Sequence, residues 1–199
     1  ALSALVAQAS PDGLPMAQGA VFDGGVMYSP WINLESNGPT YYSQLFGNHS
    51  DGDVLLGDVN FGFGNPDAVV TGSQDGARQY WNDLKDPVAN PFYAPESWLE
   101  NIVPISLHVG MPELLQSDST IFGQNAAQAG ASWVETHAFD GMWHVFQMYS
   151  DGCGSGSPLV LAQISLNVSK QFYDAVLLQG KNTQSDGIYC AVNHYEYPL

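Results

Sequence analysis

Two short segments with β-strand character, each followed by a helical segment, constrain the fold of this chain more than any other feature. Residues 102–110 form an apolar run bounded by turn formers, which predicts a central buried strand. Apolar positions at helical spacing predict a helix over residues 118–129, and residues 133–139 alternate like a second strand. Residues 159–178 predict a long closing helix. Strand, helix, strand and helix joined by short links predict an α/β fold, with a mostly parallel sheet flanked by helices.

The N-terminal part of the chain is harder to assign to regular elements. Residues 1–12 are expected to hold a helix that has no capping residue ahead of it, which favours an upstream segment removed by processing. A short buried strand is predicted within residues 20–28. Residues 31–70, rich in Gly, Asn and aromatic residues, predict a long loop excursion with one short helix near residues 41–46. Residues 76–84 have helical character.

The charge balance excludes several classes of partner. The 199 residues include 20 Asp and Glu against 4 Lys and Arg, a formal net charge of −16. Binding of phosphates depends on basic groups, so neither nucleic acid nor an anionic membrane is an expected partner. No apolar run approaches the roughly 20 residues that a membrane-spanning helix needs. The length and 45% apolar content suggest one domain with a sizeable core.

Cysteines and glycosylation sequons favour an extracellular location. Cys153 and Cys190 lie too far apart for a redox or zinc Cys-x-x-Cys motif, and their even number suits one disulfide, with two free thiols as the alternative. Asn48 and Asn167 each begin an Asn-x-Ser sequon. Only 12% of the residues are charged, so neutral polar groups build much of the surface. We therefore expect a secreted glycoprotein.

Candidate catalytic residues follow the two predicted strands. Ligands in open α/β sheets lie outside the carboxyl ends of the strands, and there Glu113 follows the first strand and His144 the second. A carboxylate that accepts from one imidazole nitrogen stabilises the cation while the other nitrogen moves a proton, which is two thirds of a hydrolytic triad. The alternative is structural, with His144 a hydrogen-bonded residue and Glu113 a carboxylate that stabilises a helix N-terminus.

Other candidate residues are weaker. Trp31 and Trp143 flank the expected cleft and would contact substrate, although core packing is the more common role of such residues. The remaining histidines lie inside strands or in loops, without partners at metal-ligand spacing. These are His49, His108, His137 and His194. We predict no metal and no cofactor.

Several segments resemble the hormone-sensitive-lipase-like branch of the α/β-hydrolase superfamily, in the family's order over nearly the whole chain. Residues 26–34 are similar to its SPWxDL segment, with Asn33 where Asp is usual. Residues 86–94 are similar to its DPLxSPxxA loop, and residues 105–119 to its strand and acid loop, VGxxEVLLxDS. Residues 126–146 contain counterparts of AxxAGV, VxLEV and DGMxHVF. The last motif is the most specific, because several fixed residues surround its histidine.

The resemblance implies roles for the candidate residues. His144 takes the place of the general base, which later acts as the acid. Glu113 occupies the loop position directly after the strand, where the family has its acidic residue. Asp118 is the alternative acid, but its DS segment favours capping or opening the next helix.

The third member of the triad is absent from the chain. No Gly-x-Ser-x-Gly nucleophile elbow and no His-Gly-Gly oxyanion loop is present, and Ser155 lacks the first glycine of the elbow. In the family a GDSAGG elbow precedes a helix that residues 1–9 resemble. The resemblance thus implies that residues 1–199 are the C-terminal portion of one α/β-hydrolase domain. We expect a separate N-terminal chain to complete it and to supply the serine and the oxyanion glycines. A partial sequence or a loss of catalysis would also leave the chain without its serine.

Two functional hypotheses result. The first is a secreted carboxylic ester hydrolase, an esterase or lipase processed into a heterodimer, with a Ser-His-Glu or Ser-His-Asp triad and neutral, apolar ester substrates. The second is a non-catalytic binding protein on a hydrolase scaffold that has lost its serine. Aromatic residues in a polar, Asn-rich loop are compatible with carbohydrate as the ligand of such a protein.

Overall fold

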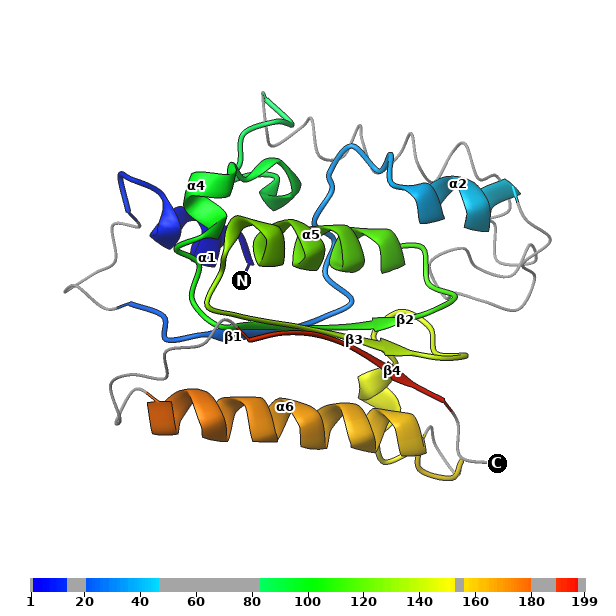
Figure 1. Cartoon of the computed structure of the whole chain (residues 1–199). Coiled ribbons are helices and arrows are strands. Elements are labelled where there is room, and N and C mark those ends of the chain that lie inside the picture. Colours follow the sequence, from blue (N-terminus) through cyan, green and yellow to red (C-terminus); the bar gives the residue numbers. More distant parts are fainter. Residues whose placement is uncertain (1, 14–20, 47–82, 153–155, 180–188, 197–199) are drawn as a thin grey trace.

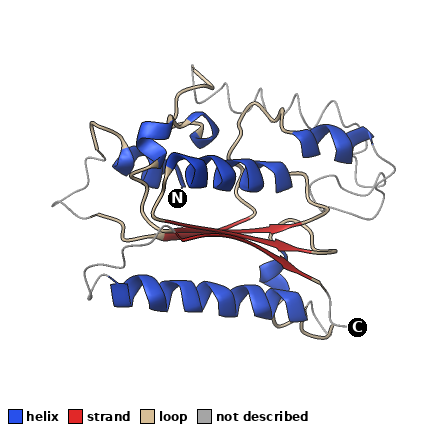
Figure 2. Cartoon of the chain, in the orientation of Figure 1, coloured by secondary structure: helices blue, strands red, loops and turns tan. Residues whose placement is uncertain are grey.

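A parallel sheet with helices on both faces forms the centre of the structure (Figures 1 and 2). The computed structural model describes residues 2–13, 21–46, 83–152, 156–179 and 189–196. Within them four strands lie side by side in chain order, all parallel: β1 (Gly25–Tyr28), β2 (Ile105–Gly110), β3 (Trp133–Phe139) and β4 (Tyr189–Tyr195). The α/β architecture predicted from the order of strands and helices is confirmed.

The helices form two layers around this sheet (Figure 1). One layer holds α1 (Leu2–Ala9), α4 (Glu96–Leu99) and α5 (Gln116–Ala129), while α6 (Val160–Gln179) covers the opposite face. Helix α2 (Pro39–Phe46) lies next to α5. Two short 3-10 helices, η3 (Pro91–Tyr93) and η4 (Phe146–Tyr149), complete the described elements. No helix in the described part of the chain has both the length and the apolar character needed to cross a bilayer.

The elements differ from the sequence predictions in two places, at the end of the first helix and at the last strand. The first helix ends at Ala9 instead of residue 12, because Pro11 has no amide hydrogen to donate and Gly13 adopts a left-handed φ of +65°. Helix α2 agrees with the short helix expected near residues 41–46 of the excursion. Residues 47–70 of the excursion lie outside the described residues, as do residues 76–82 of the predicted helical segment. Strand β4 was not predicted at all.

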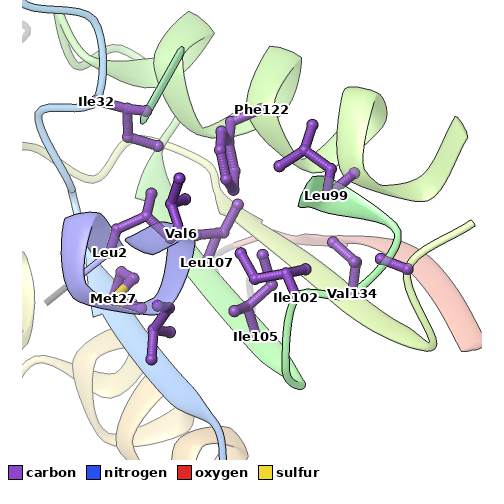
Figure 3. Packing of buried hydrophobic residues seen from close by; sticks show 13 residues of the cluster. Leu2, Val6, Met27, Ile32, Leu99, Ile102, Ile105, Leu107, Phe122 and Val134 are labelled. Atoms are coloured by element: carbon purple, nitrogen blue, oxygen red, sulfur yellow. The ribbon is translucent and has the colours of Figure 1, made fainter. Parts of the chain in front are cut away.

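The face of the sheet beneath α1, α4 and α5 carries the aliphatic core (Figure 3). Ile105 and Leu107 of β2 are fully buried and pack in the same cluster as Phe122 of α5. The cluster extends over four further elements through Val6, Met27, Leu99 and Val134. Each fully buried side chain of this size stabilises the fold by about 1.5–3 kcal/mol relative to exposure. This core therefore holds β2 rigidly at the centre of the sheet.

The opposite face of the sheet, beneath α6, carries buried polar side chains beside a second apolar cluster. His108 of β2 contacts Ser165 of α6 through Nδ1 at 2.8 Å and Ser106 through Nε2 at 3.0 Å. On β3, Nε2 of His137 lies 2.9 Å from a carboxylate oxygen of Glu135. Burial lowers the pKa of His108 well below its usual range, and the neighbouring His137 lowers it further. Buried polar groups require such partners, so this layer fixes the position of α6 on the sheet.

Candidate functional site

The candidate residues lie in the two loops that leave the carboxyl ends of β2 and β3. The amide of Met111, in the loop after β2, donates to the carbonyl of Phe139 at the end of β3, with an N–O distance of 2.9 Å. Glu113 lies two residues farther along the first loop, and His144 lies in the second loop, just before η4. The parallel register of the strands thus brings residues 31 positions apart in the sequence to one edge of the sheet.

Glu113 and His144 face each other across this edge. Oε1 of Glu113 lies 3.8 Å from Nδ1 of His144, and the glutamate side chain is completely buried whereas the histidine side chain is 20% exposed. A distance of 3.8 Å is longer than a hydrogen bond, and contacts between catalytic acids and bases are often this long in the absence of substrate. The two residues that the sequence singled out are therefore brought together, with the imidazole as the accessible partner.

The second carboxylate oxygen of Glu113 is held by two donors. Oε2 accepts from the amide of Gly110 at 2.9 Å and from the hydroxyl of Ser29 at 2.7 Å. Position 110 requires glycine, because an added Cβ would lie 1.9 Å from the carbonyl oxygen of Met142. Neither Ser29 nor Gly110 was recognised from the sequence, since their contacts depend on the arrangement of three separate loops.

Asp118 is equally buried but holds a different part of the chain. Its Oδ2 accepts from the amides of Ile32 and Asn33, at 3.0 and 2.8 Å, and from the hydroxyl of Tyr41 at 3.1 Å. Burial raises the pKa of Asp118 to about 7, against the lowering effect of these donors, and the charge of Glu113 raises it further. Asp118 lies in the first turn of α5, as its motif suggested. Its carboxylate, however, binds the backbone of the segment after β1 and does not cap α5. Its contacts are thus those of a structural residue.

The two candidate tryptophans occupy different environments. Trp31 is 43% exposed and donates from Nε1 to the carbonyl of Asn33 at 3.0 Å. Trp143 is partly buried, packs against a core cluster that includes Phe146, and contacts the ring of Tyr149 edge-on at 5.5 Å. The surroundings of Trp143 are those of a packing residue, and Trp31 presents an exposed surface beside the segment that Asp118 holds.

The described residues include one cysteine of the predicted disulfide and one of the two sequons. Cys153 and Asn48 lie outside the described residues, so the disulfide and the first sequon stay predictions. Cys190 belongs to β4, in register with Val134, and Asn167 is exposed on α6. No group of three or more His, Cys, Asp or Glu side chains that could hold a metal occurs in the described ranges.

Comparison with solved structures finds esterases and lipases. An esterase/lipase from an uncultured bacterium matches over 88% of this chain and 49% of its own length, with 22% identity and a TM-score of 0.60. A hormone-sensitive lipase from a metagenome library matches over 77% and 44%, with 27% identity and a TM-score of 0.53. A homologue of hormone-sensitive lipase from a metagenome library matches over 83% and 47%, with 27% identity and a TM-score of 0.53.

No protein-family profile and no curated protein matches the chain. The chain spans about half the length of the solved structures that it matches. The fold similarity agrees with the motif resemblance found in the sequence, although the two rest on different observations. The chain therefore has the α/β-hydrolase fold of the hormone-sensitive-lipase-like esterases, and it corresponds to the C-terminal part of that fold.

Proposed function

We propose that the chain is the C-terminal portion of a secreted carboxylic ester hydrolase whose triad consists of a serine outside this chain, His144 and Glu113. One observation carries the proposal. The buried carboxylate of Glu113 lies 3.8 Å from the accessible imidazole of His144, at the edge of a parallel sheet where α/β enzymes bind their ligands. Solved structures with the same fold are those of esterases and lipases, which supports a hydrolase of that kind.

The proposed reaction is acyl transfer through a covalent intermediate. The serine attacks the ester carbonyl while His144 accepts its proton, and the alcohol leaves with that proton. Water then attacks the acyl-enzyme, again with His144 as base, and releases the acid. Because Nδ1 of His144 faces Glu113, Nε2 is the nitrogen that exchanges protons with the serine and the alcohol. Glu113 keeps the imidazole in that tautomer and stabilises the imidazolium form.

Glu113 is a better acid for this triad than Asp118. The carboxylate of Asp118 is engaged by two backbone amides and by Tyr41, whereas that of Glu113 directs one oxygen toward the imidazole. A raised pKa near 7 also makes Asp118 a poorer permanent anion for an imidazolium partner.

We further propose that an N-terminal companion chain or preceding segment supplies the serine and the oxyanion glycines. Two observations support it. The chain spans about half the length of the esterases that it matches, and the outer edge of β1 has no paired strand among the described residues. An unpaired edge of a parallel sheet is a site for a further strand. The acidic composition, with only 12% charged residues, supports secretion and a neutral, apolar ester as substrate.

A fluorophosphonate probe tests the proposal, because such probes react with activated serines. The native, unreduced protein is labelled, and every chain is then identified by mass spectrometry and N-terminal sequencing. We expect the label on a serine within Gly-Asp-Ser-Ala-Gly, upstream of or associated with this chain, and weaker labelling in His144→Ala. A homogeneous 21.4 kDa species without any label would contradict the proposal. That result would favour a non-catalytic binding protein.

A further inference from the structure

We propose that Ser29 is a positioning residue for the proposed reaction, one that acts through Glu113 and through the loop that carries His144. This role rests on the proposed function. The hydroxyl of Ser29 contacts both halves of the candidate site, although Ser29 itself belongs to neither loop. It directly follows the last residue of β1, 84 positions before Glu113 and 116 positions before Val145.

Both hydrogen-bonding capacities of the hydroxyl are used within the site. Oγ of Ser29 donates to Oε2 of Glu113 at 2.7 Å and accepts from the amide of Val145 at 3.0 Å. The backbone is fixed as well, because the amide of Ser29 donates to the carbonyl of His108 at 2.7 Å. Ser29 is 2% exposed, so water does not compete for these contacts. One buried hydroxyl thus links the acid loop directly to the histidine loop.

The hydroxyl determines which oxygen of Glu113 faces the imidazole. Oε2 is engaged by the amide of Gly110 and by Ser29, which directs Oε1 toward Nδ1 of His144. Without the hydroxyl, Oε2 would have one fewer donor and the carboxylate could rotate. Val145 directly follows His144, so loss of its amide partner would also loosen the backbone that orients the imidazole.

Backbone conformation at both ends of this link is unfavourable. Ser29 has φ +46° and Val145 has φ +50°, a region that side-chain-bearing residues avoid and β-branched residues most of all. Such conformations persist where the surrounding contacts impose them, and they concentrate at sites where position matters. The shared hydrogen bond joins the two unusual residues. The two strained residues and the hydrogen bond that joins them therefore both serve to hold Glu113 against His144.

Kinetics of two substitutions separate the hydroxyl from the backbone. Ser29→Gly removes the hydroxyl and relieves the left-handed conformation, whereas Ser29→Ala removes the hydroxyl alone. In the complete protein we expect both variants to lower kcat for a p-nitrophenyl ester by about 10- to 100-fold, the effect of losing a hydrogen bond to a charged group. KM should stay within about twofold, because the contact orients the catalytic pair and does not bind substrate. Unchanged kcat in Ser29→Gly would overturn the proposal, as would a loss confined to KM.

Ser36 provides a matched control. It is also a buried serine, 1% exposed with φ +50°, and it lies in the same segment after β1. Its amide donates to the carbonyl of Asn33 at 2.9 Å, a contact that involves neither Glu113 nor His144. Ser36→Gly should therefore leave kcat within about twofold of the parent protein. An equal loss of kcat in Ser36→Gly would mean that any change in this segment damages the site, and it would overturn the specific role of Ser29.

A double-mutant cycle with Glu113→Gln tests whether Ser29 acts through the carboxylate. Residual hydrolysis remains measurable in triad variants. If Ser29 works through Glu113, Ser29→Gly costs much less in the Glu113→Gln background than in the parent protein. A purely structural role predicts the same loss in both backgrounds, and that result would contradict the proposal.

A spectroscopic measurement keeps the role of Ser29 separate from the proposed function. The 15N chemical shifts of the His144 imidazole report its contact with Glu113 whether or not the protein hydrolyses esters. We expect Ser29→Gly to move the Nδ1 shift in the same direction as Glu113→Gln does, and Ser36→Gly to leave it in place. Parent-like shifts in Ser29→Gly would overturn the positioning role. Absence of hydrolysis with the expected shifts would reject the esterase function alone.

Discussion

Glu113 and Asp118 are both completely buried at the carboxyl edge of the sheet, yet their carboxylates have different partners. That of Glu113 lies 3.8 Å from an imidazole nitrogen of His144, and that of Asp118 accepts from the amides of Ile32 and Asn33. The two carboxylates are only five positions apart in the sequence. Glu113 nevertheless lies beside the imidazole of His144, whereas Asp118 holds a backbone segment.

This difference predicts different kinetic effects for the two acids. Glu113→Gln keeps the size of the side chain but removes the charge beside the imidazole, so we expect kcat of the complete enzyme to fall by about 10²- to 10⁴-fold. Asp118→Asn should lower kcat by less than about tenfold and act mainly on stability. Steady-state kinetics together with thermal unfolding check both effects. A larger kcat loss in Asp118→Asn than in Glu113→Gln would reverse the assignment.

Asp118 also predicts a dependence of stability on pH. Burial raises its pKa in the folded protein to about 7, whereas the unfolded chain has a value of about 4. Between these values the folded state holds more protons than the unfolded state, so its contribution to the free energy of unfolding falls as pH rises from about 4 to 7. The change over this range is on the order of 4 kcal/mol, and Asp118→Asn should remove it. Urea unfolding at a series of pH values measures the slope, and a slope retained in Asp118→Asn would contradict this origin.

Glu135 predicts the opposite dependence of stability on pH, with a contribution that is lost at acidic pH. Burial raises its pKa, but the hydrogen bonds from His137 and Trp133 outweigh that effect and lower the pKa overall. Its stabilising contribution is therefore present above the unfolded pKa of about 4.3 and lost as pH falls through the lower folded value. Glu135→Gln should cost about 1–2 kcal/mol at neutral pH and less below about pH 4. An equal cost at both pH values would show that the charge of Glu135 does not matter.

The aliphatic core predicts a large effect at one position and a small one at another. Phe122, 1% exposed, fills the space between α5 and the sheet, so Phe122→Ala should destabilise the fold by about 3–5 kcal/mol. Leu177, 58% exposed on α6, serves as the control, and Leu177→Ala should change the free energy of unfolding by less than about 0.5 kcal/mol. Denaturant unfolding compares the two, and similar losses would contradict the core as described.

The central strands and helices could be predicted from the sequence because their signals are local. The apolar run that contains β2, the alternation of β3 and the helical spacing of α5 and α6 each reflect burial along a single element. Strand β4, Tyr189–Tyr195, was missed because its apolar run covers only its first four residues and polar groups follow. Its Asn193 and Tyr195 side chains approach His137, a contact that only the folded sheet creates.

The candidate site was predictable in part for the same reason. Glu113 and His144 were found because each directly follows a strand, and parallel strands end at one edge. Ser29 and Gly110 were not found. The role of Ser29 depends on contacts with two loops distant in sequence, and that of Gly110 depends on the approach of Met142. Sequence position therefore identified the candidate acid and base, but it did not identify the residues that orient them.

Ester hydrolysis by His144→Ala, compared with the parent and with His194→Ala, tests the proposed catalytic role of His144 most directly. His194 is an exposed residue of β4, outside the candidate site, and provides the matched control. In the complete protein we predict a loss of about 10³-fold or more in kcat for His144→Ala and parent-like kcat for His194→Ala. Undiminished hydrolysis by His144→Ala would contradict that role.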